Sequence, residues 1–207
     1  MTPEDFAAAA NVSRETLNRL MEMDRVLTEW SARHNLVARS TLETRWSRHY
    51  LDSAQIAPHV PAHARRLADI GSGGGFPGLV LAAMLAEKNV RVTLIESTGK
   101  KAAFLRAAGD AMGLANLEVI PARIESTTLA APPDVVTARA LARLDQLLGY
   151  VHGIQGKNTR ALLLKGQDVE AELTEAAKSW HMDVKRHPSL TSPDATLLEI
   201  AGLRPLT

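Results

Sequence analysis

The chain has 207 residues and nearly balances 24 Lys and Arg against 23 Asp and Glu, and its net charge of +1 excludes a histone-like polycation. With 45% hydrophobic and 23% charged residues, the composition is typical of a folded globular protein. The absence of cysteine excludes disulfides, thiolate metal sites and a catalytic thiol. The N-terminus does not resemble a signal peptide and no apolar stretch is long enough to cross a bilayer, so we expect a cytoplasmic protein without membrane contact.

The distribution of glycine divides the chain in two. Residues 1–66 contain none and residues 67–207 contain all 13, which predicts an N-terminal helical extension (1–66) followed by an α/β domain (67–207). In the extension, four alanines at 7–10 are typical of a short helix, and Ser13 can cap a second helix that continues to His34. We expect a further helix from Thr41 past Leu51.

After residue 66, short apolar segments alternate with helical ones. The expected strands are 67–70, 92–96, 117–120, 135–138, 161–165 and 196–201. The expected helices are 77–88, 100–113, 141–151 and 169–180. This alternation predicts a mainly parallel sheet with helices on both faces.

Positive charge gathers in the second half of the extension. Residues 33–66 hold six Arg against two acids, a local charge of +4. One interpretation is a solvated helical face. The other is a phosphate-binding surface, in which Arg39, Arg45 and Arg48 contact RNA.

The segment 69–78 runs from an apolar strand through a glycine cluster into a helix. A dinucleotide fingerprint would have to start at Gly73, several residues after the strand, and no Gly-Lys-Ser/Thr of a Walker loop follows. The pattern Asp69-x-Gly71-x-Gly73-x-Gly75 instead begins within the strand. Because Asp69 would repel a pyrophosphate, the loop favours S-adenosylmethionine, which carries an ammonium and a sulfonium and no phosphate.

Residues at three other strand ends extend the expected cofactor site. Glu96 follows the second strand, where an acid binds ribose hydroxyls; the alternative is an acid at a helix start. Ile124 and Glu125 follow the third strand, in position to meet the adenine. Arg139 ends the fourth strand and needs an anionic partner, such as the cofactor carboxylate, a nucleic acid, or Asp69 or Glu125 in a purely structural ion pair.

Residue types and motifs that the chain lacks narrow the range of atoms that could accept the methyl group. Methylation of pyrimidine C5 needs a Cys nucleophile. The Asn/Asp-Pro-Pro-aromatic motif common in transfer to base amines is also absent, because residues 137–140 read Thr-Ala-Arg-Ala. A ring nitrogen such as guanine N7 has an in-plane lone pair and needs alignment but no general base. Lys165, at the end of the fifth strand, is a second cationic candidate for RNA contact.

The chain resembles the bacterial RsmG family, historically called glucose-inhibited division protein B, over nearly its whole length. The resemblance is carried by Asn35-Leu36, Arg48-His49-x-Leu51-Asp52-Ser53, the loop ending Gly75-Phe76-Pro77-Gly78, Glu96-Ser97-x-Gly99-Lys100-Lys101, Arg123 with Glu125, the strand Asp134 to Ala140, and Lys165-Gly166. Glu96 and Thr98 depart from it, because many members have Asp and Leu there.

The resemblance implies a Rossmann-like class I methyltransferase with a mostly parallel seven-stranded sheet. It also implies transfer of a methyl group from S-adenosylmethionine to N7 of a guanine in the 530-loop of 16S ribosomal RNA. Gly71, Phe76, Ile124, Glu125 and Arg139 would line the cofactor, and Arg139 would be needed for activity. We expect a monomer that acts on 16S ribosomal RNA within the 30S particle or its precursor, with no metal. A binding module without catalysis and an NAD-linked oxidoreductase are the alternatives.

Overall fold

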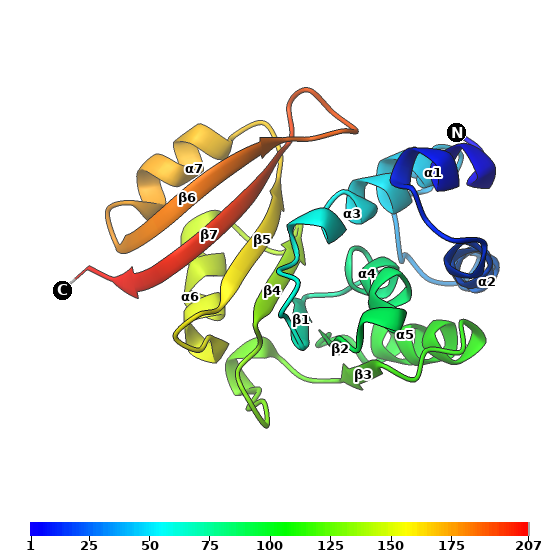
Figure 1. The fold of residues 1–207 in the computed structure, drawn as a ribbon, viewed down its shortest axis with the longest axis horizontal. Helices are drawn as coiled ribbons and strands as arrows, with labels where there is room; N and C mark the ends of the chain where they lie inside the picture. The colour runs from blue at the N-terminus through cyan, green and yellow to red at the C-terminus, as the bar shows by residue number, and fades with distance from the viewer. Residues whose placement is uncertain (207) are drawn as a thin grey trace.

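The computed structural model describes residues 1–206 (Figure 1). The extension forms six helical elements: α1 (Pro3–Ala10), α2 (Arg14–Ser31), η1 (Arg39–Thr41), η2 (Trp46–Leu51), α3 (Asp52–Ala54) and η3 (Ala57–His59). Helix α1 confirms the alanine-based prediction. Helix α2 begins as predicted, because the Ser13 hydroxyl accepts a hydrogen bond from the Thr16 amide at 3.1 Å.

Two predicted boundaries in the extension are wrong. Helix α2 ends at Ser31, where the Trp30 carbonyl accepts from the amides of both Arg33 and His34, a shared bond that is common at helix termini. The longer helical segment predicted from Thr41 begins at Trp46, after the short 3-10 helix η1, and its first turn is π-helical. The Thr41 hydroxyl donates to the Ala38 carbonyl at 2.7 Å, a local bond that competes with helix formation.

The α/β part is one seven-stranded sheet with the order β3-β2-β1-β4-β5-β7-β6, in which β7 runs in the direction opposite to the other six strands. The strands are β1 (Arg66–Ile70), β2 (Arg91–Ile95), β3 (Leu117–Ile120), β4 (Val135–Arg139), β5 (Arg160–Lys165), β6 (Trp180–Pro188) and β7 (Thr196–Pro205). The helical elements between them are α4 (Gly78–Leu85), η4 (Ala86–Lys88), α5 (Gly99–Ala111), η5 (Ile124–Ser126), α6 (Leu144–Ile154) and α7 (Val169–Ala176). The mainly parallel sheet is confirmed.

Strand β6 is not among the strands expected from apolar segments, although the family resemblance implies seven strands. It lies at the sheet edge and pairs only with β7. Its Trp180, Met182 and Val184 alternate with more exposed polar residues. This period of two is the signal that identifies the strand.

Apolar side chains form two cores, one on each face of the sheet. The extension packs with α4 and α5 on one face, where Phe6, Leu20 and Tyr50 share a core with Leu79 and Phe104. Helices α6 and α7 cover the other face. The extension therefore belongs to the same folded unit as the sheet, although β1 begins close to the expected boundary after residue 66. No helix of residues 1–206 is long and apolar enough to cross a membrane.

Candidate active site

The glycine loop joins β1 to α4 and rests on the end of β2. The amides of Gly71 and Ser72 donate to the Ile95 carbonyl at 2.9 and 3.2 Å, and the Gly73 amide donates to Glu96 Oε2 at 2.8 Å. Gly71, Gly73 and Gly75 have φ values of +67°, +53° and +87°, a conformation that other residues rarely adopt. The sequence folds locally this way because its glycines stand where positive φ is required.

One side of Gly73 is open. A side chain built there would meet only the Gly71 carbonyl, at 3.7 Å, so a ligand can approach the backbone at this point. The flanking glycines are covered: a side chain at Gly71 would collide with Leu141, and one at Gly75 with Leu79. Gly73 is thus the point of the loop best suited to ligand contact.

Asp69 is fully buried under the loop. Its Oδ1 accepts a hydrogen bond from the Thr137 hydroxyl at 2.7 Å, which joins β1 to β4. Its Oδ2 has no hydrogen-bond partner among the described residues. Burial raises the pKa of Asp69 to about 6, although the Thr137 hydrogen bond opposes the shift. Direct contact between Asp69 and a cofactor stays a prediction. The contact present in the structure, with Thr137, joins two strands of the sheet.

Glu96 is 5% exposed and lies directly after β2. Its two oxygens accept hydrogen bonds from the backbone amides of Gly73, at 2.8 Å, and Thr98, at 2.7 Å. An ionised carboxylate offers about four acceptor sites, so each oxygen keeps one for a ribose hydroxyl. Besides the predicted role, Glu96 holds the glycine loop in place.

A cavity of about 120 Å³ lies beside the loop, on the side where we expect the adenosine. Gly71, Ile124 and Glu125, which are predicted to contact the cofactor, line it. Leu141 and Tyr150 also line it and were not predicted. Leu141 is 36% exposed and lies two residues after the end of β4. A large apolar residue just beyond the carboxyl end of a strand is the sequence signal by which it could have been found.

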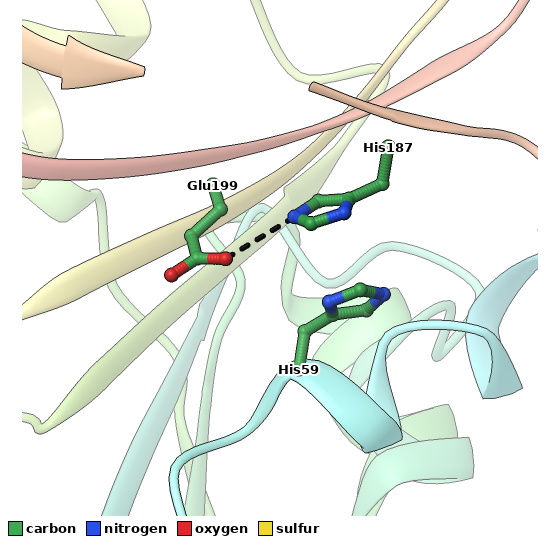
Figure 2. Close-up of side chains that lie close together, drawn as sticks. All are labelled: His59, His187 and Glu199. Carbon is green, nitrogen blue, oxygen red and sulfur yellow. Dashed lines mark hydrogen bonds and ion pairs between the residues drawn. The ribbon is translucent and has the colours of Figure 1, made fainter. Parts of the chain in front are cut away.

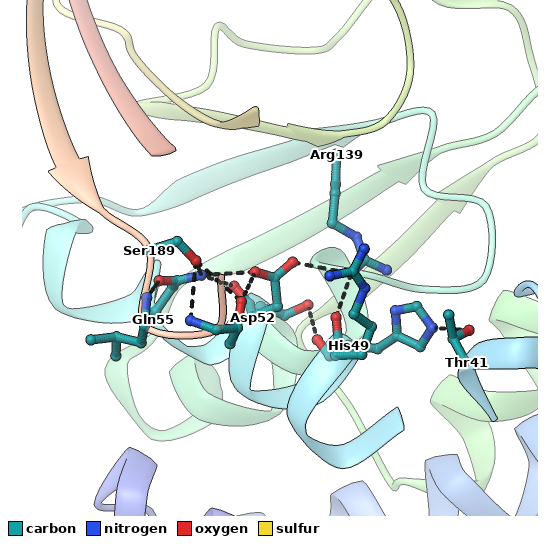
Figure 3. Close-up of polar contacts among 10 residues, drawn as sticks. Thr41, His49, Asp52, Gln55, Arg139 and Ser189 are labelled. Carbon is teal, nitrogen blue, oxygen red and sulfur yellow. Dashed lines mark hydrogen bonds and ion pairs between the residues drawn. The ribbon is translucent and has the colours of Figure 1, made fainter. Parts of the chain in front are cut away.

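Arg139 ends β4, and within the chain its acidic partner is neither Asp69 nor Glu125, the two acids considered for a structural ion pair. Its Nη1 donates to Asp52 Oδ2 at 3.2 Å and to the Arg48 carbonyl at 3.3 Å (Figure 3). Its guanidinium also lies 5.2 Å from the centre of the Phe76 ring, a cation–π contact. The alternative of a structural ion pair with Asp69 or Glu125 is therefore wrong, and Arg139 links the glycine loop to the extension.

His49 also packs against Phe76, with ring centres 5.0 Å apart. Its Nε2 is 2.8 Å from the Thr41 hydroxyl. Since that hydroxyl donates its one proton to Ala38, His49 Nε2 must be the donor in this contact. Burial, and then the positive charges of Arg139 and Arg48, lower the pKa of His49 to about 4. His49 is therefore neutral near pH 7 and does not add to the positive charge of the site.

The Arg-rich segment is not one continuous surface. Arg45 forms an ion pair with Asp24 through Nε and Nη2, the latter at 2.8 Å, and Nη1 donates to the Leu42 carbonyl at 2.7 Å. Arg66 starts β1, at the end of the strand opposite the glycine loop. Arg39 and Arg48 are exposed, and Arg48 lines the cavity beside Arg139. The proposal of RNA contact consequently rests on Arg39 and Arg48.

Lys165, the other predicted RNA contact, is half-buried at the end of β5. Its Nζ lies 2.7 Å from Glu172 Oε2 and donates to the Ala142 carbonyl at 3.1 Å. The same Glu172 oxygen accepts the Leu144 amide at 2.6 Å. Lys165 thereby anchors residues 142–144 after β4, and its charge is already balanced.

Two histidines and a glutamate form a separate cluster where the extension meets the β6–β7 hairpin (Figure 2). His187 Nε2 lies 3.1 Å from Glu199 Oε2, and the His59 and His187 ring centres are 4.1 Å apart. Three such ligands can hold a metal ion. However, Arg160 lies 3.0 Å from the other Glu199 oxygen and Lys185 lies 3.8 Å from it. The carboxylate is already neutralised by cations, which favours a structural polar network.

The fold and the glycine loop define a class I S-adenosylmethionine-dependent methyltransferase fold. An O-methyltransferase from Bacillus cereus has a TM-score of 0.60 at 16% identity, covering 87% of this chain and 90% of its own. An S-adenosylmethionine-dependent methyltransferase from Aquifex aeolicus has a TM-score of 0.59 at 14% identity, covering 76% and 92%. At these identities the likeness concerns the fold alone.

Sequence comparison gives the family. The model of the GidB family, described as rRNA small subunit methyltransferase G, matches residues 15–198. Ribosomal RNA small subunit methyltransferase G of Parvibaculum lavamentivorans is 45% identical, covering 97% of this chain and 89% of its own. That of Paramagnetospirillum magneticum is 46% identical, covering 97% and 95%. The chain belongs to the GidB family, which confirms the resemblance.

Proposed function

We propose that this chain transfers a methyl group from S-adenosylmethionine to N7 of a guanine in the 530-loop of 16S ribosomal RNA. The observation that supports it best is the arrangement at the carboxyl ends of β1, β2 and β4. There, the open face of Gly73 lies beside Glu96, and Arg139 lies between the loop and an open cavity that Arg48 also lines. Membership of the GidB family supports small-subunit ribosomal RNA as the substrate.

The residues around the loop fit S-adenosylmethionine better than a dinucleotide. The loop amides of Gly71, Ser72 and Gly73 are bound within the chain, so they are not available as a phosphate cradle. Glu96 has acceptor capacity for ribose, and Ile124 with Glu125 lines the space beside it. When bound, S-adenosylmethionine supplies an activated methyl group on a sulfonium.

The proposed methyl transfer requires the chain to hold the guanine base and the methyl donor in line. N7 of guanine attacks through its own lone pair, so the chain needs neither a general base nor a covalent intermediate. Arg139 donates a hydrogen bond to O6 and so orients the base, with N7 aligned behind the methyl group. His49 is neutral and has its Nε2 proton held by Thr41, so we assign it no proton transfer.

Substrate binding is proposed to use exposed Arg side chains. Arg39 and Arg48 would contact RNA phosphates, while Arg45 and Lys165 hold the structure around them. Near-neutral total charge favours a structured ribosomal substrate, the 30S particle or its precursor, over naked RNA. One chain holds the loop, Arg139 and the cavity, so a monomer suffices. A ribosomal substrate implies a cytoplasmic reaction.

Methyl transfer from labelled S-adenosylmethionine to 30S particles and to naked 16S ribosomal RNA tests the proposal. The expected product is 7-methylguanosine, identified by nucleoside analysis, with faster transfer to the particle. Cofactor binding without transfer would instead support a binding module, and binding of NADH in place of S-adenosylmethionine would support an oxidoreductase. A methyl group on another atom would refute the N7 assignment.

A further inference from the structure

An open cavity of about 670 Å³ lies beside Arg139 and falls in the size range of small-ligand sites. Three separate parts of the chain form it: the helical segment of the extension, the ends of β4 and β5, and the β6–β7 loop. Asp52, Arg139 and Thr191 are among the residues that line it. A nucleobase that enters this cavity therefore meets side chains from both the extension and the sheet.

Asp52 is a carboxylate with one acceptor site to spare. Its Oδ1 accepts from the Thr191 hydroxyl at 2.7 Å and from Gln55 Nε2 at 2.9 Å, and its Oδ2 accepts only from Arg139 at 3.2 Å (Figure 3). With about four acceptor sites on a carboxylate, Oδ2 keeps one that no residue of 1–206 fills. Thr191 and Gln55 fix the carboxylate from the side away from Arg139, so its free site is pre-oriented.

Arg139 has spare donors beside that acceptor. Only its Nη1 is bound within residues 1–206, to Asp52 and to the Arg48 carbonyl. Its distance of 3.2 Å to Asp52 is longer than the roughly 2.7–2.9 Å of a tight charged pair. A guanidinium has five N–H donors, so Nε and Nη2 remain free to bind a ligand. The pair thus presents free donors next to a free acceptor.

The free donors of Arg139 beside the free acceptor of Asp52 are complementary to the O6 and N1–H edge of guanine and not to the corresponding edge of adenine. Guanine carries the acceptor O6 next to the donor N1–H, whereas adenine carries a donor amine next to an acceptor nitrogen. Resting on the function proposed above, we propose that Asp52 determines base specificity: its Oδ2 accepts the N1–H of the target guanine while Arg139 donates to O6. Guanine N7 stays free for methylation. Adenine would put donor against donor and acceptor against acceptor, and sites built on such bonds reject mismatched bases strongly.

The test replaces the target guanosine in 16S ribosomal RNA, which is then assembled into 30S particles. Inosine keeps O6 and N1–H, and 2-aminopurine riboside lacks both. Single-turnover methyl transfer at saturating S-adenosylmethionine compares the wild type with Asp52→Asn. Glu170→Gln is the control, because it removes an exposed ion pair with Arg186 outside the cavity.

The wild type is expected to use guanosine and inosine within about tenfold of each other and 2-aminopurine riboside about 100-fold more slowly, since two bonds to charged groups are lost. Asp52→Asn should reduce the ratio of guanosine to 2-aminopurine rates by about tenfold or more, and Glu170→Gln should leave that ratio unchanged. If Asp52→Asn lowers all rates by one common factor, Asp52 only positions Arg139 and the inference is wrong.

Competition binding of the same RNAs separates this inference from the proposed function. A preference of the wild type for guanosine RNA that Asp52→Asn abolishes supports base selection even if no methyl group is transferred, in which case the proposed function fails. Equal binding of both RNAs by both proteins overturns base selection, even where methylation of guanosine is observed.

Discussion

Asp69 and His49 give the free energy of unfolding opposite pH dependences. The pKa of Asp69 is about 6 in the folded protein against an ordinary 3.8, so the folded state binds its proton more tightly. The stability that this provides is full below about pH 4 and is lost as the pH rises to about 6. The pKa of His49 is about 4 against 6.5, so its contribution is lost as the pH falls through the same range.

Asp69→Asn isolates one of these effects. The Asn side-chain oxygen can still accept the Thr137 hydroxyl, but no charge is buried at the higher pH. From the folded and ordinary pKa values of Asp69, the stability of the wild type relative to Asp69→Asn should fall by about 2 kcal/mol between about pH 4.5 and pH 7, because a tenfold change in proton affinity corresponds to about 1.4 kcal/mol. A His49→Gln variant should show the opposite sign.

Urea unfolding followed by circular dichroism at several pH values measures these differences. Asp110→Asn, which removes an exposed carboxylate from α5, is the matched control. If the difference between the wild type and Asp69→Asn stayed constant across the range, Asp69 would not be a buried acid with a raised pKa, and the explanation would be wrong.

Three further predictions concern the loop and the charged side chains. Gly73→Val should weaken S-adenosylmethionine binding in calorimetry, whereas Gly113→Val, at a similar φ of +64° with no neighbour within 4 Å, should cost stability without affecting binding. Arg48→Gln should reduce the salt dependence of RNA binding by about one unit or less, whereas Arg45→Gln, which breaks the pair with Asp24, should lower thermal stability. Arg139→Ala should stay slow in methyl transfer at saturating cofactor; near-normal turnover would make Arg139 a binding or structural residue.

The sequence predicted the parallel part of the sheet well because its strands are short apolar runs buried on both faces. Thus β1, β4 and β5 began and ended within a residue or so of the expected positions. The edge strand β6 was harder to find, because Lys185 and Arg186 stand in a run that is only half buried. Thr41 illustrates a second limit. Its hydroxyl donates to the nearby Ala38 carbonyl, and such local bonds compete with helix formation. The longer helix therefore starts later than the apolar spacing alone predicts.

Site residues at strand ends were predictable, but their partners were not. Strand order brings Glu96 to the glycine loop because β1 and β2 are parallel neighbours, and that order is readable from the motif. The pairing of Arg139 with Asp52 spans 87 residues and depends on how the extension docks on the sheet. No local pattern encodes that docking, so the sequence indicates no role for Asp52 beyond its place in the family motif.

The docking of the extension also explains why residue 74 is a glycine, although its φ is not positive. Gly74 lacks a positive φ, yet a side chain built there would lie 2.8 Å from the Leu36 carbonyl oxygen and 3.2 Å from Val37. Because backbone cannot yield as a flexible side chain can, only glycine lets the loop rest against residues 36–37. The same extension supplies Asp52 and His49 to the site. The part of the chain without glycine therefore shapes the glycine loop, and the two segments that composition separates form one site.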